Sequence, residues 1–164
     1  MSGSVVLLSS GLDSTVNLLE SLAEGPVRLA LTFHYGQKAA EREIAKAQSI
    51  CRKKGVNHLV VDLPFFKSFT KTSLISEKEK IPTGADVNIH SYEKSLLTAE
   101  KVWVPNRNGI FLNVAAGFAE GAGASVVVPG FNIEEATTFP DNSEDFQEAL
   151  NRSFSFSTQN KIKV

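Results

Sequence analysis

The stretch Ser9-Ser10-Gly11-Leu12-Asp13-Ser14-Thr15 decides the fold, because it joins two different periodicities in the chain. It follows an apolar run at 5–8, typical of a short buried strand, and it opens a segment with helical periodicity. The turn between such a strand and helix exposes backbone N–H groups that have no intrahelical partner, at the positive end of the helix dipole. The stretch therefore predicts an anion-binding turn.

The residue types of this turn suit a phosphate group. Gly11 lets the backbone approach a ligand closely, and the hydroxyl groups of Ser9, Ser14 and Thr15 are hydrogen-bond donors. Asp13 is the exception, since a carboxylate repels phosphate; it fits as a helix-cap acceptor or as a ligand of a magnesium ion that the phosphates share. No Gly-Lys-Ser or Gly-Lys-Thr follows, so the turn is not a Walker-type P-loop. A plain Ser/Gly helix cap is the alternative.

Length and composition favour a soluble globular protein. The 164 residues predict a single domain spanning 1–164, and 42% hydrophobic with 21% charged residues is ordinary for such a domain. The net charge of -1 gives no electrostatic case for binding nucleic acid or an anionic membrane, and no apolar run is long enough to span a bilayer. Cys51 is the one cysteine, which excludes an intrachain disulfide and a multi-cysteine metal site within these residues. We expect a cytoplasmic protein.

Strand and helix patterns alternate along the chain. Strands are expected at 5–8, 27–33, 58–63 and 125–129, with helices at about 13–23, 38–54 and 143–154. A further helix is expected after a cap at Asn106 or Asn108, and it closes at Gly121. This alternation predicts an α/β fold with a doubly wound, mainly parallel sheet and helices on both faces. An irregular segment at about 64–100 is expected to be a lid, in which three phenylalanines near 65–69 form a short turn over the sheet edge, and 161–164 resembles the opening of a fifth strand.

The helical periodicity also predicts which side chains face the core. Cys51 lies on the apolar face of the second helix, so it is expected to be a core residue rather than a nucleophile. The first helix is expected to bury Leu12, Val16, Leu19 and Leu22, and the last helix Phe146, Ala149, Leu150 and Phe154.

Further polar residues are expected at the edge of the sheet where the anion-binding turn lies. Ligands of open α/β sheets bind beyond the carboxyl ends of the strands. Arg107 lies near a helix N-terminus, where the dipole disfavours a cation unless an anion pairs with it; a solvated surface arginine is the alternative. Glu134, Glu135 and Asp141 follow the fourth strand and suit magnesium or an amine, or else form a solvated acidic loop. The histidines show no metal-ligand spacing.

Four stretches together resemble one enzyme family. They are 8–15, Phe33-His34-Tyr35-Gly36-Gln37, Val104-Pro105-Asn106-Arg107-Asn108, and 130–142 with its Phe139-Pro140-Asp141. The first is similar to the pyrophosphate loop Ser-Gly-Gly-x-Asp-Ser of N-type ATP pyrophosphatases, which have the adenine nucleotide alpha hydrolase-like fold. The four in this order resemble the 7-cyano-7-deazaguanine synthases, over nearly the whole chain apart from the lid.

The resemblance implies a reaction and a set of site residues. The family uses ATP and magnesium to activate 7-carboxy-7-deazaguanine as an adenylate, ammonia gives an amide, and a second activation dehydrates the amide to the nitrile of queuosine biosynthesis. By motif position, the residues implied to hold ATP are Leu8, Ser9, Ser10, Gly11, Leu12, Asp13, Ser14 and Thr15. The implied catalytic residues are Asp13, Arg107 and Asp141, with Asp13 also on the magnesium side. The implied substrate-binding residues are Tyr35, Gln37, Asn108 and Glu135.

The chain also departs from the family pattern. Ser10 and Asn106 stand where the family has glycine, Glu135 stands for Asp, and 137–142 departs from Ser-Gly-Tyr-Pro-Asp-Cys. The family binds zinc through four cysteines in a C-terminal region, and no zinc ligands of that kind occur here, so we expect a C-terminally incomplete domain. The family is homodimeric by the same resemblance. A non-catalytic nucleotide-binding relative, or a pyrophosphate-loop enzyme with another substrate, are the alternatives.

Overall fold

The computed structural model describes residues 2–70, 72, 74, 103–131 and 138–164. These residues form a four-stranded sheet in the order β3-β2-β1-β4, in which every neighbouring pair is parallel. The strands are β1 (Gly3–Leu7), β2 (Val27–His34), β3 (His58–Asp62) and β4 (Ala124–Val128). The predicted strands and the doubly wound parallel topology are thus confirmed, and the strand order reverses direction between β1 and β4.

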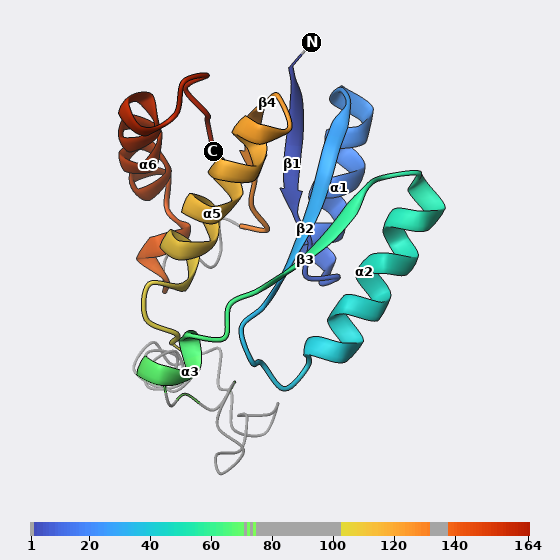
Figure 1. The fold of residues 1–164 in the computed structure, drawn as a ribbon, viewed down its shortest axis with the longest axis vertical. Helices are drawn as coiled ribbons and strands as arrows, with labels where there is room; N and C mark the ends of the chain where they lie inside the picture. The colour runs from blue at the N-terminus through green and yellow to red at the C-terminus, as the bar shows by residue number, and fades with distance from the viewer. Residues whose placement is uncertain (1, 71, 73, 75–102, 132–137) are drawn as a thin grey trace.

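Helices cover both faces of the sheet (Figure 1). They are α1 (Leu12–Glu24), α2 (Ala40–Lys54), α3 (Phe66–Phe69), α5 (Arg107–Gly121) and α6 (Glu144–Ser157), with a 3-10 turn η2 (Pro140–Asn142) before α6. Successive strand residues point to opposite faces, so Val5 packs in the core beneath α5 and α6, and Val6 in the core beneath α1 and α2. Cys51 lies in the second core and is 1% exposed, as predicted.

The apolar face predicted for α1 is wrong at three of its four positions; the fourth residue, Leu22, packs against the core beneath α1 and α2. Leu12 is 80% exposed, and Val16 and Leu19 are also exposed, whereas the buried residues of the helix include Ser14 and Ser21. Small side chains let the helix lie close against the end of the sheet. The Ser21 hydroxyl donates to the Asn17 carbonyl at 2.7 Å, which satisfies it locally. The helix is therefore held by small, internally bonded residues and by Leu18.

The end of the chain lies beside β4. Ser143 caps α6, where its hydroxyl accepts from the Phe146 N–H at 3.2 Å. Leu150 and Phe154 are buried as predicted, but Ala149 is exposed, so that member of the predicted apolar face is wrong. Lys163 then forms a single parallel bridge with β4, donating its N–H to the Ser125 carbonyl at 2.9 Å, which matches the predicted opening of a fifth strand.

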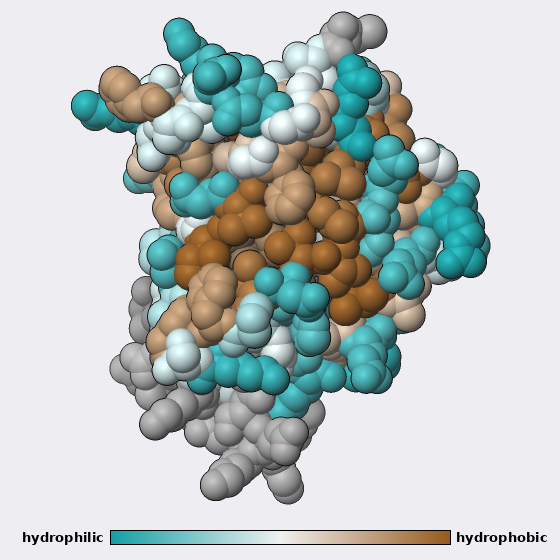
Figure 2. Space-filling view, viewed as in Figure 1, coloured by the Kyte–Doolittle hydropathy of each residue, from teal (hydrophilic) through white to brown (hydrophobic). Residues whose placement is uncertain are grey.

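The side of the sheet that carries β2 and β3 keeps an apolar surface. Figure 2 shows a broad hydrophobic area in the middle of this face, beside α5. Leu59 of β3 pairs with Leu31 of β2 in the same orientation and is 40% exposed. The short helix α3, where the sequence predicted a turn, inserts the fully buried Phe66 at this edge. Most of the predicted lid, from residue 75 onward, lies outside the described residues.

None of the helices in the described residues combines the length and the apolar character that crossing a membrane requires.

Candidate active site

A cavity of about 350 Å³ opens at the carboxyl ends of β1, β2 and β4, where the strand order reverses. This is the position at which open α/β sheets bind ligands. Its volume is within the range of small-molecule sites. Seven of the site residues predicted from the sequence line it: Leu8, Ser9, Ser14, Tyr35, Gln37, Arg107 and Asn108.

The turn after β1 forms one end of the cavity. Gly11 is the N-cap of α1 and has no side chain with which to cap the helix, so the first-turn N–H groups keep no intrahelical acceptor. The Ser9 hydroxyl accepts from the Gly11 N–H at 3.3 Å and lies 3.1 Å from the Ser14 hydroxyl. Two hydroxyl groups and a helix N-terminus therefore converge at this end, in the arrangement that favours an anion.

Ser10 has a φ of 64°, in the left-handed region that favours glycine. It is the position where the resemblance places a glycine, so the serine adopts the backbone conformation that glycine would supply. Asn106, the other departure from glycine, also has a positive φ, of 51°. Asparagine tolerates this region better than most residues. Both departures thus preserve the local backbone geometry.

Five residues of the turn do not line the cavity with the others. The Thr15 hydroxyl donates to the Gly11 carbonyl at 2.7 Å, so it is engaged by its own helix. Leu12 points to solvent, and Ser10, Gly11 and Asp13 also lie outside the lining. The residues of the turn that reach the cavity are therefore Ser9 and Ser14.

The loop after β4 closes the same end from the other side. Gly130 lines the cavity, and a Cβ at this position would stand 3.2 Å from the Ser14 Cβ. The Asn17 side chain donates to the Pro129 carbonyl at 2.7 Å, which ties α1 to this loop. The absence of a side chain at Gly130 therefore sets the width of the site beside Ser14. Glu135 lies outside the described residues.

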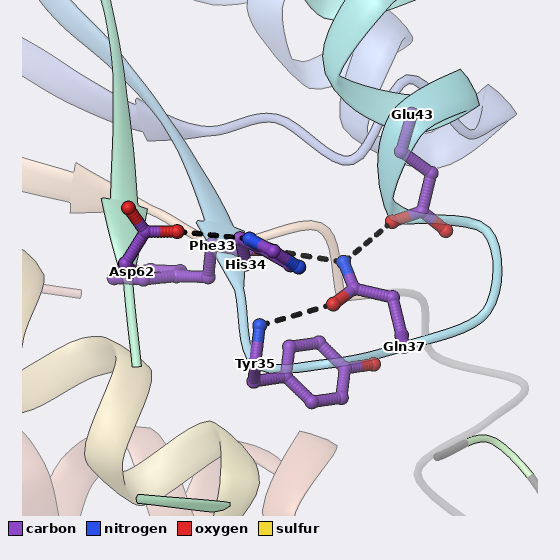
Figure 3. A network of polar contacts seen from close by, with 6 residues as sticks. All are labelled: Phe33, His34, Tyr35, Gln37, Glu43 and Asp62. Carbon is purple, nitrogen blue, oxygen red and sulfur yellow. Dashed lines mark hydrogen bonds and ion pairs between the residues drawn. The ribbon is translucent and has the colours of Figure 1, made fainter. Parts of the chain in front are cut away.

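Gln37 also lines the cavity, and its amide is satisfied within the protein (Figure 3). Its Oε1 accepts from the Tyr35 N–H at 3.0 Å, and its Nε2 donates to the Phe33 carbonyl at 3.0 Å and to Glu43 Oε2 at 2.9 Å. Only 7% of the residue is exposed. Gln37 therefore holds the turn after β2 together and orients Glu43, beyond lining the cavity.

Arg107 begins α5 and lines the cavity. Its guanidinium group lies near the Tyr35 hydroxyl, and its Nε donates to Asn108 Oδ1 at 3.4 Å. Burial raises the pKa of Tyr35, and the nearby Arg107 offsets part of that rise. A cation at a helix N-terminus is unfavourable unless an anion shares the site. Arg107 is thus placed for a ligand phosphate or carboxylate.

Asn108 connects Arg107 to the turn at η2. Its Nδ2 donates to Asn142 Oδ1 at 2.8 Å and to the Asp141 carbonyl at 3.4 Å, and its Oδ1 accepts from Arg107. Burial raises the pKa of the Asp141 carboxyl group, and Arg107 opposes that rise. Asp141 therefore lies within the electrostatic reach of Arg107, although it does not line the cavity.

The structure adds residues that sequence reasoning missed. Thr32 lines the cavity, and its hydroxyl donates to the Leu8 carbonyl at 2.6 Å, where it fixes the end of β1. Glu43 and Phe111 also line it, as does Asn142. Their common signal is position: each follows a carboxyl end of a strand or faces one from a helix. Residue type alone did not reveal it.

Metal-binding residues are sparse in the described part of the chain. The described residues contain no group of three or more His, Cys, Asp or Glu side chains that could hold a metal ion. His34 pairs instead with Asp62 at 2.8 Å, and Cys51 is buried in the core. These residues do not fit the four-cysteine zinc site that the resemblance implies.

The fold and the cavity define a doubly wound α/β protein: a parallel sheet whose first turn leads into a helix N-terminus beside a cavity that Arg107 also lines. The chain belongs to the family of the queuosine biosynthesis protein QueC, whose model matches residues 3–164.

Curated relatives support the same assignment. The chain is 53% identical over 161 residues to a protein of Bdellovibrio bacteriovorus, covering 98% of this chain and 70% of the relative. It is 48% identical over 164 residues to a protein of Carboxydothermus hydrogenoformans, and the match covers 100% of this chain and 75% of the relative. It is 49% identical over 160 residues to one of Methanocaldococcus jannaschii, covering 98% and 68%. All three are named 7-cyano-7-deazaguanine synthase, so an enzyme is favoured over the non-catalytic alternative.

Proposed function

We propose that this protein is an ATP-dependent ligase that converts 7-carboxy-7-deazaguanine and ammonia to 7-cyano-7-deazaguanine, the synthase reaction of queuosine biosynthesis. The observation that carries the proposal is the cavity itself. Its lining brings together Ser9 and Ser14 of the turn after β1, Tyr35 and Gln37 of the turn after β2, and Arg107 of α5. The family membership and the relatives' names supply the substrate.

The first step is formation of an acyl adenylate. A carboxylate oxygen of the substrate attacks the α-phosphorus of ATP, and pyrophosphate leaves. The turn at Ser9 and the N-terminus of α1 bind the departing pyrophosphate, while Arg107 pairs with the charge that develops on the α-phosphate. Catalysis here consists of positioning and charge stabilisation, since no nucleophile of the protein is needed.

The second step makes the amide, and a second activation makes the nitrile. Ammonia attacks the acyl carbon, AMP leaves, and one proton is lost from nitrogen. The amide oxygen then attacks the α-phosphorus of another ATP, and pyrophosphate leaves. Loss of AMP and of the two protons that remain on nitrogen leaves the carbon–nitrogen triple bond. Asp141, with its pKa raised by burial and its place near Arg107, is our candidate acceptor of these protons.

Magnesium would neutralise phosphate charge when bound with ATP. The carboxylate of Asp13, in the first turn of α1, is the residue we propose for that ion. A homodimer is part of the same proposal, and zinc is not, because the residues described here do not fit it.

The direct test mixes the protein with magnesium-ATP, 7-carboxy-7-deazaguanine and ammonia, and follows pyrophosphate release and product mass. We expect pyrophosphate release that requires the deazaguanine, and accumulation of the nitrile when ammonia is present. ATP binding without substrate-dependent release would contradict the proposal in favour of a non-catalytic module. Release with a different carboxylic acid would point to another substrate.

A further inference from the structure

Glu43 is a carboxylate of the cavity wall that the proposed reaction does not yet use. It lies in the first turn of α2 and lines the same cavity as Ser9 and Ser14 of the anion-binding turn. It is the acid among the residues that line this cavity; the other polar lining groups are hydroxyls, amides and Arg107. An acid in the first turn of a helix is stabilised by the dipole.

The orientation of this carboxylate is fixed by the protein (Figure 3). Gln37 Nε2 donates to Glu43 Oε2 at 2.9 Å, and Gln37 is itself held by the backbone of Phe33 and Tyr35. The hydrogen bond from Gln37 uses one lone pair of Oε2, and a carboxylate has further lone pairs with which it can accept from a ligand. Preorganised acceptors of this kind discriminate between ligands, because a mismatch leaves a buried polar group unpaired.

Aromatic rings line the same cavity as this carboxylate and Arg107. The rings of Phe33 and Phe111 stack with their centroids 4.3 Å apart, and the centroids of the Tyr35 and Phe111 rings are 5.4 Å apart. All three line the cavity. A flat heterocycle can pack against such a wall while its edges reach the polar groups at either end.

The ring system of a 7-deazaguanine has two unlike edges. Its pyrimidine edge presents two adjacent donors, the ring N1–H and the exocyclic 2-amino group, and its 7-carboxyl group lies on the far side of the ring. A carboxylate accepts from two adjacent donors, whereas the corresponding edge of adenine presents one donor and one acceptor. A carboxylate at this wall therefore favours the deazaguanine over the adenine of ATP.

We propose that Glu43 is the specificity residue that binds the N1–H and 2-amino edge of the deazaguanine, which turns the 7-carboxyl group toward Arg107 and the anion-binding turn. The inference rests on the proposed function, since that supplies the substrate. Gln37 is then a positioning residue that acts through Glu43.

The test compares Glu43→Gln with Glu41→Gln, a matched change of an exposed acid in the same helical turn. The glutamine oxygen at 43 can still accept from Gln37, so the wall stays intact while one acceptor becomes a donor that repels the ligand edge. We expect the Kd for 7-carboxy-7-deazaguanine to rise about 10–100-fold in Glu43→Gln, with the Kd for ATP unchanged. Glu41→Gln is expected to match wild type for both ligands.

An analogue of the deazaguanine without the 2-amino group completes a double-mutant cycle, in which one change is made in the protein and the other in the ligand. Wild type should bind it about 10-fold or more weakly than the parent compound, and Glu43→Gln should discriminate much less. Calorimetry measures the affinities, and circular dichroism checks that both variants are folded. The proposed role of Glu43 would be overturned if Glu43→Gln bound the deazaguanine with an unchanged Kd, or if its affinity for ATP fell instead. Turnover by wild type would in either case leave the proposed function standing. Wild type that turns over no deazaguanine would overturn the proposed function by itself.

Discussion

Replacing Ser10 by glycine is expected to stabilise the protein without changing its activity. Ser10 has a φ of 64°, a conformation that a residue with a Cβ adopts at a cost and glycine adopts freely. The side chain of Ser10 does not line the cavity, so its removal takes no group from the site. We therefore expect the substitution to act on stability and to leave the cavity lining unchanged.

The magnitude follows from two opposing terms. Relief of a left-handed non-glycine residue is worth about 1–2 kcal/mol. Glycine also gives the unfolded chain more freedom, which costs about 0.5–1 kcal/mol. The expected net stabilisation is about 0.5–1 kcal/mol, which corresponds to a rise in Tm of roughly 1–4 °C for a chain of this size.

The assay is urea denaturation of wild type and Ser10→Gly, with kcat/KM measured on the same preparations. Ser153→Gly is the matched control, because Ser153 is an exposed residue inside α6 where glycine should destabilise by about 0.5 kcal/mol. Opposite signs for the two substitutions are expected, with kcat/KM of Ser10→Gly within about twofold of wild type. Destabilisation by Ser10→Gly, or a gain in kcat/KM of tenfold or more, would refute the reasoning.

Three further changes test other parts of the site. Gly130→Ala puts a methyl group 3.2 Å from the Ser14 Cβ and should lower kcat/KM about 3–10-fold. The control Gly117→Ala has open space around it and should leave kcat/KM unchanged. Equal effects of the two substitutions on kcat/KM would contradict this account of the loop. Gln37→Leu leaves the Tyr35 N–H and the Phe33 carbonyl unpaired and should lower the free energy of unfolding, measured by urea denaturation, by about 1–3 kcal/mol. A loss of less than about 0.5 kcal/mol would show that the amide network is dispensable. Burial raises the folded-state pKa of Asp141, so its contribution to stability is present below the usual aspartate pKa and is lost as pH rises through the folded pKa. The free energy of unfolding of Asp141→Asn, relative to wild type, should therefore increase as the pH of the denaturation experiment is raised from about 3 to 7. A relative gain found only at acidic pH would contradict the expected direction.

The fold could be predicted from the sequence because strand and helix periodicities are strong and regular. The Ser9–Thr15 turn, the parallel sheet and the helix that ends at Gly121 all follow from such patterns. The buried face of α1 could not be predicted this way. Ser14 and Ser21 are buried for close packing and local hydrogen bonding, and neither reason is visible as hydrophobicity.

The site was predictable in its location but not in its division of roles. The carboxyl ends of the strands bring Tyr35, Arg107 and Asn108 together as expected. That the Gln37 amide is satisfied internally depends on the path of the turn after β2, which the sequence does not specify. Glu43 escaped notice for the same reason, since only that network brings it to the cavity wall.

The central claim is that an adenylate forms between the anion-binding turn and Arg107. Its most direct measurement is exchange of labelled pyrophosphate into ATP, dependent on 7-carboxy-7-deazaguanine, in wild type, Arg107→Gln and the exposed control Arg152→Gln. We predict exchange in wild type and Arg152→Gln, and a loss of about 10²–10³-fold in Arg107→Gln. Exchange that proceeds equally well without Arg107, or without the deazaguanine, would contradict the account.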